Sequence, residues 1–362
     1  LYRKKRGQNN VRDNAPKIPE ARDPGDSTQN FMKRLAHYAL LAGICLFLLG
    51  FFFRLSVMGR SPEELTFTPL EDDSYYTQSY ARHIAHGEFF SINGMQRSDA
   101  YFPLYTTMCS FFHSLSPHDP VQAIRMVIGF NIGIFILATI VFGLILHCFL
   151  RDIDRAYRWK FSCFGAGIYA SSAILFCLDM NLMETGLLLL MYNLIFLQTV
   201  SMYQNNTRNN RDYLTLGVLF ALGCLTRIDM IIFVCGYILA MIVMRNRWRV
   251  NLTKIVYMAG PPVCAAGLWL GIAYKGTGML FPTGGAACTR LDVPIFVANI
   301  KRAGAMIFNF FLGLPHTYYN FWDLWWARHP LVRMTLFIIL SIIIVACLRG
   351  LFKNNAKGVG VL

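Results

Sequence analysis

The chain has 362 residues, of which 55% are hydrophobic and only 15% are charged, and its mean hydropathy is +0.41. This composition leaves too little polar surface to cover a soluble globule, so it excludes a water-soluble protein and favours membrane spans of about 20 residues each. The net charge of +14 does not indicate a nucleic-acid partner, because Lys and Arg gather at the ends of apolar runs rather than on a soluble face.

The first 34 residues are polar and carry nine Lys and Arg. We predict that residues 1–34 form a disordered, basic cytoplasmic tail that contacts anionic membrane lipids. The apolar run that follows is too long for a cleavable signal peptide, and we interpret it as the first transmembrane helix.

Apolar runs along the rest of the chain bring the number of predicted transmembrane helices to eight. The fold class is therefore an all-α polytopic membrane protein, with a transmembrane domain over 35–350 and a short cytoplasmic tail over 351–362. The predicted spans are 36–57, 121–150, 161–178, 182–203, 213–227, 230–244, 255–275 and 331–349.

Lys and Arg also predict the orientation of these spans, because cytoplasmic loops carry an excess of positive charge. Of the 34 Lys and Arg, 22 lie in alternate connections, which places both termini in the cytoplasm. Two long segments, 58–120 and 276–330, then face outward. The positively charged connections are 1–34, 151–160, 204–212, 245–254 and 349–357.

Three adjacent carboxylates, Glu71, Asp72 and Asp73, stand in the first outward segment. Residues 74–85 have the pattern of a short amphipathic helix, and the macrodipole at its start favours negative charge. A run of acids can be a solvated loop, but at a helix start it holds a carboxylate rigidly, as a general base requires. The residues of this helix available for burial are Tyr75, Tyr76, Ala81 and Ile84.

The segment continues to Asn93-Gly94 and then to Ala100-Tyr101-Phe102-Pro103-Leu104-Tyr105. From Glu71 to Tyr105 it resembles the first outer loop of the GT-C glycosyltransferases, integral membrane enzymes that use polyprenyl-phosphate sugars. In that family an acidic pair follows the first span, then a helix of the form YY…AR.IA.G, then NG and G-Y-x-P-L-W. Ala100 and Tyr105 replace the usual Gly and Trp.

Three later motifs resemble the same family. Met183-Glu184-Thr185-Gly186 is similar to its G-M-E-T motif at an outer helix start, and Leu225-Thr226-Arg227-Ile228-Asp229 is similar to its L-x-R-x-D motif at an outer helix end. Phe281-Pro282-Thr283-Gly284-Gly285 is similar to an outer P-x-S-G loop, with Arg290 as the nearest following cation. The resemblance covers roughly residues 36–290.

The resemblance implies a glycosyltransferase that moves a sugar from a polyprenyl phosphate to an acceptor hydroxyl on the extracytoplasmic side, with inversion. It implies that Asp73, with Asp72 beside it, is the general base. Arg227 and Arg290 are the candidate phosphate ligands, because guanidinium groups match phosphate oxygens. Further candidate substrate-binding residues are Glu71, Tyr76, Tyr101, Glu184 and Asp229.

These residues also have structural interpretations. Arg227 and Asp229 could be an ion pair that closes a tight hairpin between two spans, and Glu184 could be an N-terminal charge on a span. No cofactor is expected to be required. A divalent cation, if one takes part, would be held by Asp72 and Asp73, as in the oligosaccharyltransferase branch of the superfamily.

The alternative functions are a transporter or flippase of a lipid-linked or anionic substrate, and a non-catalytic assembly protein. Transporters place ionisable residues near the bilayer midplane within repeated halves, whereas here the span interiors are almost uncharged and no internal repeat is found. The expected partners are the sugar donor, a glycan, lipid or protein acceptor, and membrane lipids. The expected location is the plasma (inner) membrane of a bacterium or archaeon, with the active site facing outward.

Overall fold

The computed structural model describes residues 24–61, 64–65, 72–89, 91–95, 98, 101–205, 209–243 and 250–278. Every regular secondary-structure element within these residues is a helix, which confirms the all-α prediction. The predicted span 331–349, most of the outer segment 276–330, the tail 351–362, Glu71 and Arg290 lie outside these residues. The helices are α1 (Pro24–Met58), α3 (Asp72–Ala85), α4 (Pro103–Leu115), α5 (Pro120–Phe149), α6 (Arg155–Ser171), α7 (Ala173–Met180), α8 (Thr185–Gln204), α9 (Asn210–Thr226), α10 (Met230–Val243) and α12 (Leu252–Thr277).

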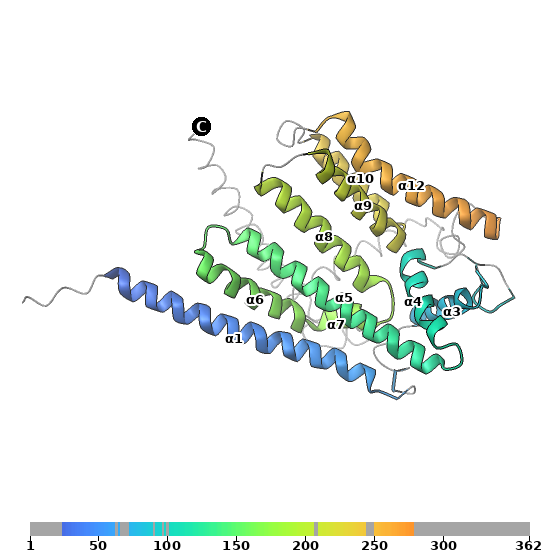
Figure 1. Ribbon diagram of the computed structural model, residues 1–362, viewed down its shortest axis with the longest axis horizontal. Helices are drawn as coiled ribbons and strands as arrows, with labels where there is room; N and C mark the ends of the chain where they lie inside the picture. The colour runs from blue at the N-terminus through green and yellow to red at the C-terminus, as the bar shows by residue number, and fades with distance from the viewer. Residues whose placement is uncertain are drawn as a thin grey trace, which may run out of the picture.

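The long helices lie alongside one another, and the short helices α3 and α4 lie together at one end of the bundle (Figure 1). We call this the α3/α4 end. The α7–α8 and α9–α10 connections are at this end, whereas the α5–α6 and α8–α9 connections are at the opposite end. The Lys- and Arg-rich connections 151–160 and 204–212 are therefore at the same end, as the charge count predicts.

Among the described residues, four helices are long and apolar enough to cross a membrane, and there are up to five if the bent pair α6–α7 is one span. Seven of the eight predicted spans fall in the part of the chain that the structure describes, and each coincides with a helix or with that bent pair. Helices α9, with 17 residues, and α10, with 14, are short for a span. The total of eight spans stays a prediction. The four long helices are Asn30–Met58, Pro120–Phe149, Thr185–Gln204 and Leu252–Thr277.

The predicted span 161–178 is not a single helix, because the chain bends by 65° between α6 and α7. Ser172 stands at the bend. Its backbone N–H donates to the carbonyl of Tyr169 at the end of α6, and its hydroxyl accepts from the N–H of Leu175 in the first turn of α7. Serine caps a helix start well, so this residue begins a new helix where sequence periodicity predicted a continuous one.

Small residues allow α1 and α6 to approach closely. A Cβ added to Gly43 would lie 2.6 Å from the carbonyl oxygen of Cys163, and one added to Gly167 would lie 2.3 Å from that of Gly43. Close contact through small residues is the usual way that helices pack in a membrane.

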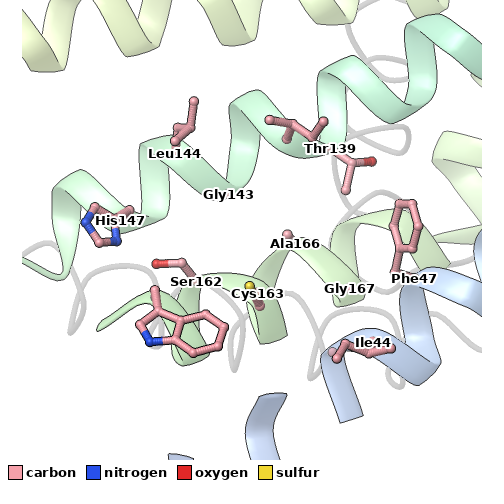
Figure 2. A pocket seen from close by; sticks show the side chains of 13 residues that line it. Ile44, Phe47, Thr139, Gly143, Leu144, His147, Ser162, Cys163, Ala166 and Gly167 are labelled. Carbon is pink, nitrogen blue, oxygen red and sulfur yellow. The ribbon is translucent and has the colours of Figure 1, made fainter. Parts of the chain in front are cut away.

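Beside this contact is a largely apolar cavity of about 380 Å³ between α1, α5 and α6 (Figure 2). None of the predicted site residues lines it, and it lies away from α3 and α4. The lining residues are Gly43, Ile44, Phe47, Thr139, Ile140, Gly143, Leu144, His147, Trp159, Ser162, Cys163, Ala166 and Gly167.

Candidate active site

Helix α3 begins at Asp72, so Asp72 and Asp73 occupy its first turn, as predicted. The side chain of Asp73 is exposed, and its backbone carbonyl accepts a hydrogen bond of 3.1 Å from the hydroxyl of Thr77. The side chain of Asp72 lies outside the described part of the chain. The helix start therefore presents the Asp73 carboxylate outward on a hydrogen-bonded first turn, where the macrodipole stabilises its charge.

The buried face of α3 differs in part from the predicted one. Ala81 and Ile84 are buried as expected, but Tyr75 is 42% exposed and Tyr76 is 56% exposed. The reason is helical phase: the tyrosines fall between the positions, three and four residues apart, that face the bundle. The buried positions of α3 are Ser74, Thr77, Gln78, Tyr80, Ala81 and Ile84.

Gln78 connects α3 to two other elements. Its Nε2 donates to the carbonyl of Leu182 at 3.3 Å, and its Oε1 lies 3.2 Å from Nε2 of His113 on α4. Burial, together with the nearby charges of Arg82 and His86, lowers the pKa of His113 to about 4. The imidazole is therefore neutral at pH 7, and it donates its Nε2 proton to Gln78.

Tyr101 joins three helices through its ring. The centroid of the Tyr101 ring is 4.9 Å from that of Tyr80 on α3 and 5.3 Å from that of Trp269 on α12. Tyr101 is 8% exposed, so it fixes the start of the α4 segment against α3 and α12. Its predicted part in substrate binding stays a prediction.

A second polar group forms at the start of α8 and the end of α9. Arg227 donates from Nη1 to Glu184 at 2.8 Å, and from Nε and Nη2 to the two oxygens of Asp229, each at 3.1 Å. Its guanidinium carbon lies 5.0 Å from the ring centre of Phe102, the residue before α4. Three predicted site residues thus meet in one cluster, which we call the Glu184–Arg227–Asp229 cluster.

Glu184 is the buried member of this cluster. It has no exposed surface, and among the described residues its Oε2 has no hydrogen-bond partner. Burial, only partly offset by Arg227, raises the pKa of Glu184 to about 7. Near neutral pH this carboxyl can therefore bind or release a proton, and its charge sets how much of the Arg227 charge is compensated.

Arg227 retains unused donors. A guanidinium has five N–H groups, and the described hydrogen bonds use three of them. The side chain is 30% exposed, and the backbone of Arg227 is extended between α9 and α10. The predicted tight hairpin is therefore confirmed, and its arginine is accessible to an anionic ligand.

The motif 100–105 lies between α3 and the Glu184–Arg227–Asp229 cluster: Tyr101 contacts α3, and the adjacent Phe102 contacts Arg227. Within the described residues, no group of three His, Cys, Asp or Glu has the geometry of a metal site. The structure thus brings Glu184, Arg227 and Asp229 together. Asp73 lies on α3, which contacts the α7–α8 connection through Gln78 and contacts the residues before α4 through Tyr80.

The sequence analysis missed one buried ion pair. Arg54 on α1 and Asp179 on α7 are 2.8 Å apart, with side chains 1% and 4% exposed. A signal was available, because a charged residue inside an apolar span is costly and calls for a partner. Arg54 lies inside the predicted span 36–57, so the interior of that span is not uncharged as the sequence analysis assumed.

Residues 121–272 match the family model for dolichyl-phosphate-mannose-protein mannosyltransferase. This is a GT-C family, so the match confirms the resemblance found in the sequence. It includes Glu184, Arg227 and Asp229 but not Asp73. Comparison with curated proteins and with solved structures gave no significant match.

The family match and the apolar helices together support a membrane glycosyltransferase of the kind that uses a polyprenyl-phosphate sugar.

Proposed function

We propose that this chain transfers a sugar from a polyprenyl phosphate to an acceptor hydroxyl, with inversion at the anomeric carbon, on the extracytoplasmic side of the membrane. The observation that carries the proposal is the accessible Arg227, held by Glu184 and Asp229, at the same end of the bundle as the acidic start of α3. Both termini are then cytoplasmic, and the α3/α4 end faces outward.

In the proposed reaction the carboxylate of Asp73 accepts the proton of the acceptor hydroxyl, and the resulting oxygen attacks the anomeric carbon. The bond between that carbon and the phosphate oxygen breaks, and polyprenyl phosphate leaves. The free N–H groups of Arg227 stabilise the charge that develops on the phosphate. Arg290 is proposed as a second phosphate ligand, and Asp72, Glu71, Tyr76 and Tyr101 as residues that help to bind the substrates.

The raised pKa of Glu184 fits this assignment. When the Glu184 carboxyl is neutral, Arg227 is left with one charged partner, Asp229. A phosphate can then approach with less repulsion than if two carboxylates surrounded it. No metal ion is needed for these steps; Asp72 and Asp73 are the residues that would hold a divalent cation if one takes part.

A transporter or flippase remains the alternative, and the buried Arg54–Asp179 pair is the one observation that favours it. The Arg54 guanidinium is satisfied by Asp179 and by the carbonyls of Gly50 and Ala170, and Arg54 lies about one turn before the end of α1 at Met58. A closed pair near a helix end suits a structural link better than an ion pathway near the midplane.

The test of the proposal is a donor screen with the protein purified in lipid nanodiscs. Polyprenyl phosphates carrying mannose, glucose or arabinose are incubated with an acceptor mixture, and the products are identified by mass spectrometry. We expect one donor to be converted to polyprenyl phosphate while its sugar appears on an acceptor. If no donor is consumed and the same lipids instead cross proteoliposome membranes, the transporter alternative is correct.

A further inference from the structure

The buried ion pair between α1 and α7 is unusually well bonded. Arg54 donates from Nε and Nη2 to Oδ2 of Asp179, at 3.2 and 2.8 Å, and from Nη1 to the carbonyls of Gly50 and Ala170, at 3.1 and 3.0 Å. Its guanidinium carbon lies 3.7 Å from the ring centre of Phe135 on α5. The guanidinium therefore fixes α7 to α1, α5 and the end of α6 at once.

Stability alone does not explain this pair. Taking two charges out of water costs about as much as their attraction returns, and apolar residues of similar size often stabilise a protein equally well. Ionisable residues within membrane spans commonly serve function instead.

Asp179 is fixed through its backbone as well as its side chain. Its carbonyl accepts from Nδ2 of Asn131 at 2.9 Å, and Oδ1 of Asn131 accepts from the hydroxyl of Tyr105 at 3.1 Å. On the α8 side, a Cβ added to Gly186 would come within 3.2 Å of Oδ1 of Asp179. Asp179 is thus tied to α1 by charge, to α4 and α5 by hydrogen bonds, and to α8 by close packing.

The connection from Asp179 to Glu184 has little freedom. Oδ1 of Asn181 accepts from the N–H of Met183 at 3.1 Å, and the hydroxyl of Thr185 donates to the carbonyl of Leu178 at 2.6 Å. Leu182 has a backbone φ of +54°, which residues other than glycine rarely adopt. Its carbonyl accepts a hydrogen bond from Gln78 of α3. A strained residue persists only where its surroundings over-determine it, often at a functional site.

We infer that Arg54 and Asp179 are positioning residues: their ion pair sets the α7–α8 connection, and through it the place of Glu184 and the Arg227 guanidinium that receives the donor phosphate. This inference rests on the proposed function for the role of Arg227. It adds two residues outside the Glu184–Arg227–Asp229 cluster on which donor affinity depends.

The test is the double variant Arg54→Met/Asp179→Asn, which removes both charges and so leaves no unpaired buried ion. Arg54→Lys keeps the charge and serves as the conservative variant. Tyr237→Phe is the matched control, because it removes a partly buried hydroxyl that bonds to Thr199 at 2.7 Å but has no described hydrogen bond to the α7–α8 connection. Each protein is measured in nanodiscs for kcat, for KM of the active donor and for amide hydrogen exchange of the segments 181–186 and 226–230.

We expect the double variant to raise the donor KM about tenfold, and to lower kcat as well because Arg227 also stabilises the charge that develops on the phosphate. Amide exchange should become faster in both segments. Arg54→Lys keeps the charge but not the two guanidinium hydrogen bonds to Asp179, so it should raise KM by a smaller factor, about threefold, and speed exchange less. Tyr237→Phe should match the wild type in KM and in exchange. A folded double variant with wild-type KM and wild-type exchange at 226–230 would overturn the inference.

If the double variant does not fold, Arg54→Lys becomes the test. A rise in KM that is smaller than that of Arg227→Gln, together with faster exchange at 226–230, supports the inference. Wild-type KM and wild-type exchange contradict it. If the wild type transfers no sugar, the proposed function fails, while the exchange of 226–230 still decides whether the ion pair positions Arg227.

Discussion

Replacing Asp73 by asparagine is expected to lower kcat for sugar transfer by about 10²- to 10⁴-fold, the usual contribution of a general base. The amide has nearly the size and shape of the carboxylate but cannot accept the proton of the acceptor hydroxyl. Asp73 is exposed in the first turn of α3, and its described hydrogen bond runs through its backbone carbonyl. The variant should therefore fold like the wild type and bind the donor with similar affinity.

The matched control for this prediction is Glu88→Gln. Glu88 is an exposed acid just beyond α3, and it pairs with His83 at 2.6 Å. Its loss should change kcat less than twofold, because surface ion pairs contribute little. Asp73→Asn activity within tenfold of the wild type, measured with the active donor, would refute the assignment of the base.

The second large effect is expected for Arg227→Gln. The substitution leaves Glu184 buried without its cation, which should lower the free energy of unfolding by about 3 kcal/mol at pH 8. It also removes the phosphate ligand, so the donor KM should rise at least about tenfold. Thermal unfolding in nanodiscs and steady-state kinetics measure the two effects separately.

The stability defect should depend on pH in a defined direction. The pKa of Glu184 is already raised to about 7, and without Arg227 it should rise further. When folding raises the pKa of a carboxyl, the folded protein is most stable with that carboxyl protonated. The free energy of unfolding is therefore highest below the ordinary pKa of the group, and it falls as the pH rises through the pKa of the folded state. The variant should unfold at a clearly lower temperature than the wild type at pH 8 and at a similar temperature at pH 5.

The double variant Glu184→Gln/Arg227→Gln separates folding from function. Because it carries no buried unpaired charge, it should recover the thermal stability at pH 8 but not the donor affinity. Recovery of both would show that Arg227 serves only to neutralise Glu184. That result would support the interpretation of Arg227 and Asp229 as a structural ion pair.

Several parts of the site follow from sequence alone because they depend on short-range signals. The hairpin at Arg227–Asp229 is such a case, since a break of three residues between two apolar runs forces a tight turn. The acidic start of α3 is another, because carboxylates favour helix N-termini. The pairing of Glu184 with Arg227 could be anticipated only through the family resemblance.

Other features could not be read from the sequence because they depend on which helices become neighbours. Arg54 and Asp179 are separated by 125 residues, and only the packing of α1 beside α6 and α7 brings them together. The contact of Tyr101 with Trp269 likewise joins the segment before α4 to α12. The exposure of Tyr75 and Tyr76 depends on which face of α3 turns toward the bundle, and the hydrophobic pattern of this short helix alone does not determine that face.

The most direct test of the account is to map where the donor phosphate binds. A polyprenyl phosphate carrying a photoreactive group on its first isoprene unit would be cross-linked to the wild-type protein in nanodiscs, and the labelled peptides identified by mass spectrometry. We predict labelling of α3, of the segment 101–105 and of residues 182–186 or 226–230, with loss of labelling when unlabelled donor competes. Competed labelling confined to the cavity between α1, α5 and α6, or to the opposite end of the bundle, would contradict the proposed active site.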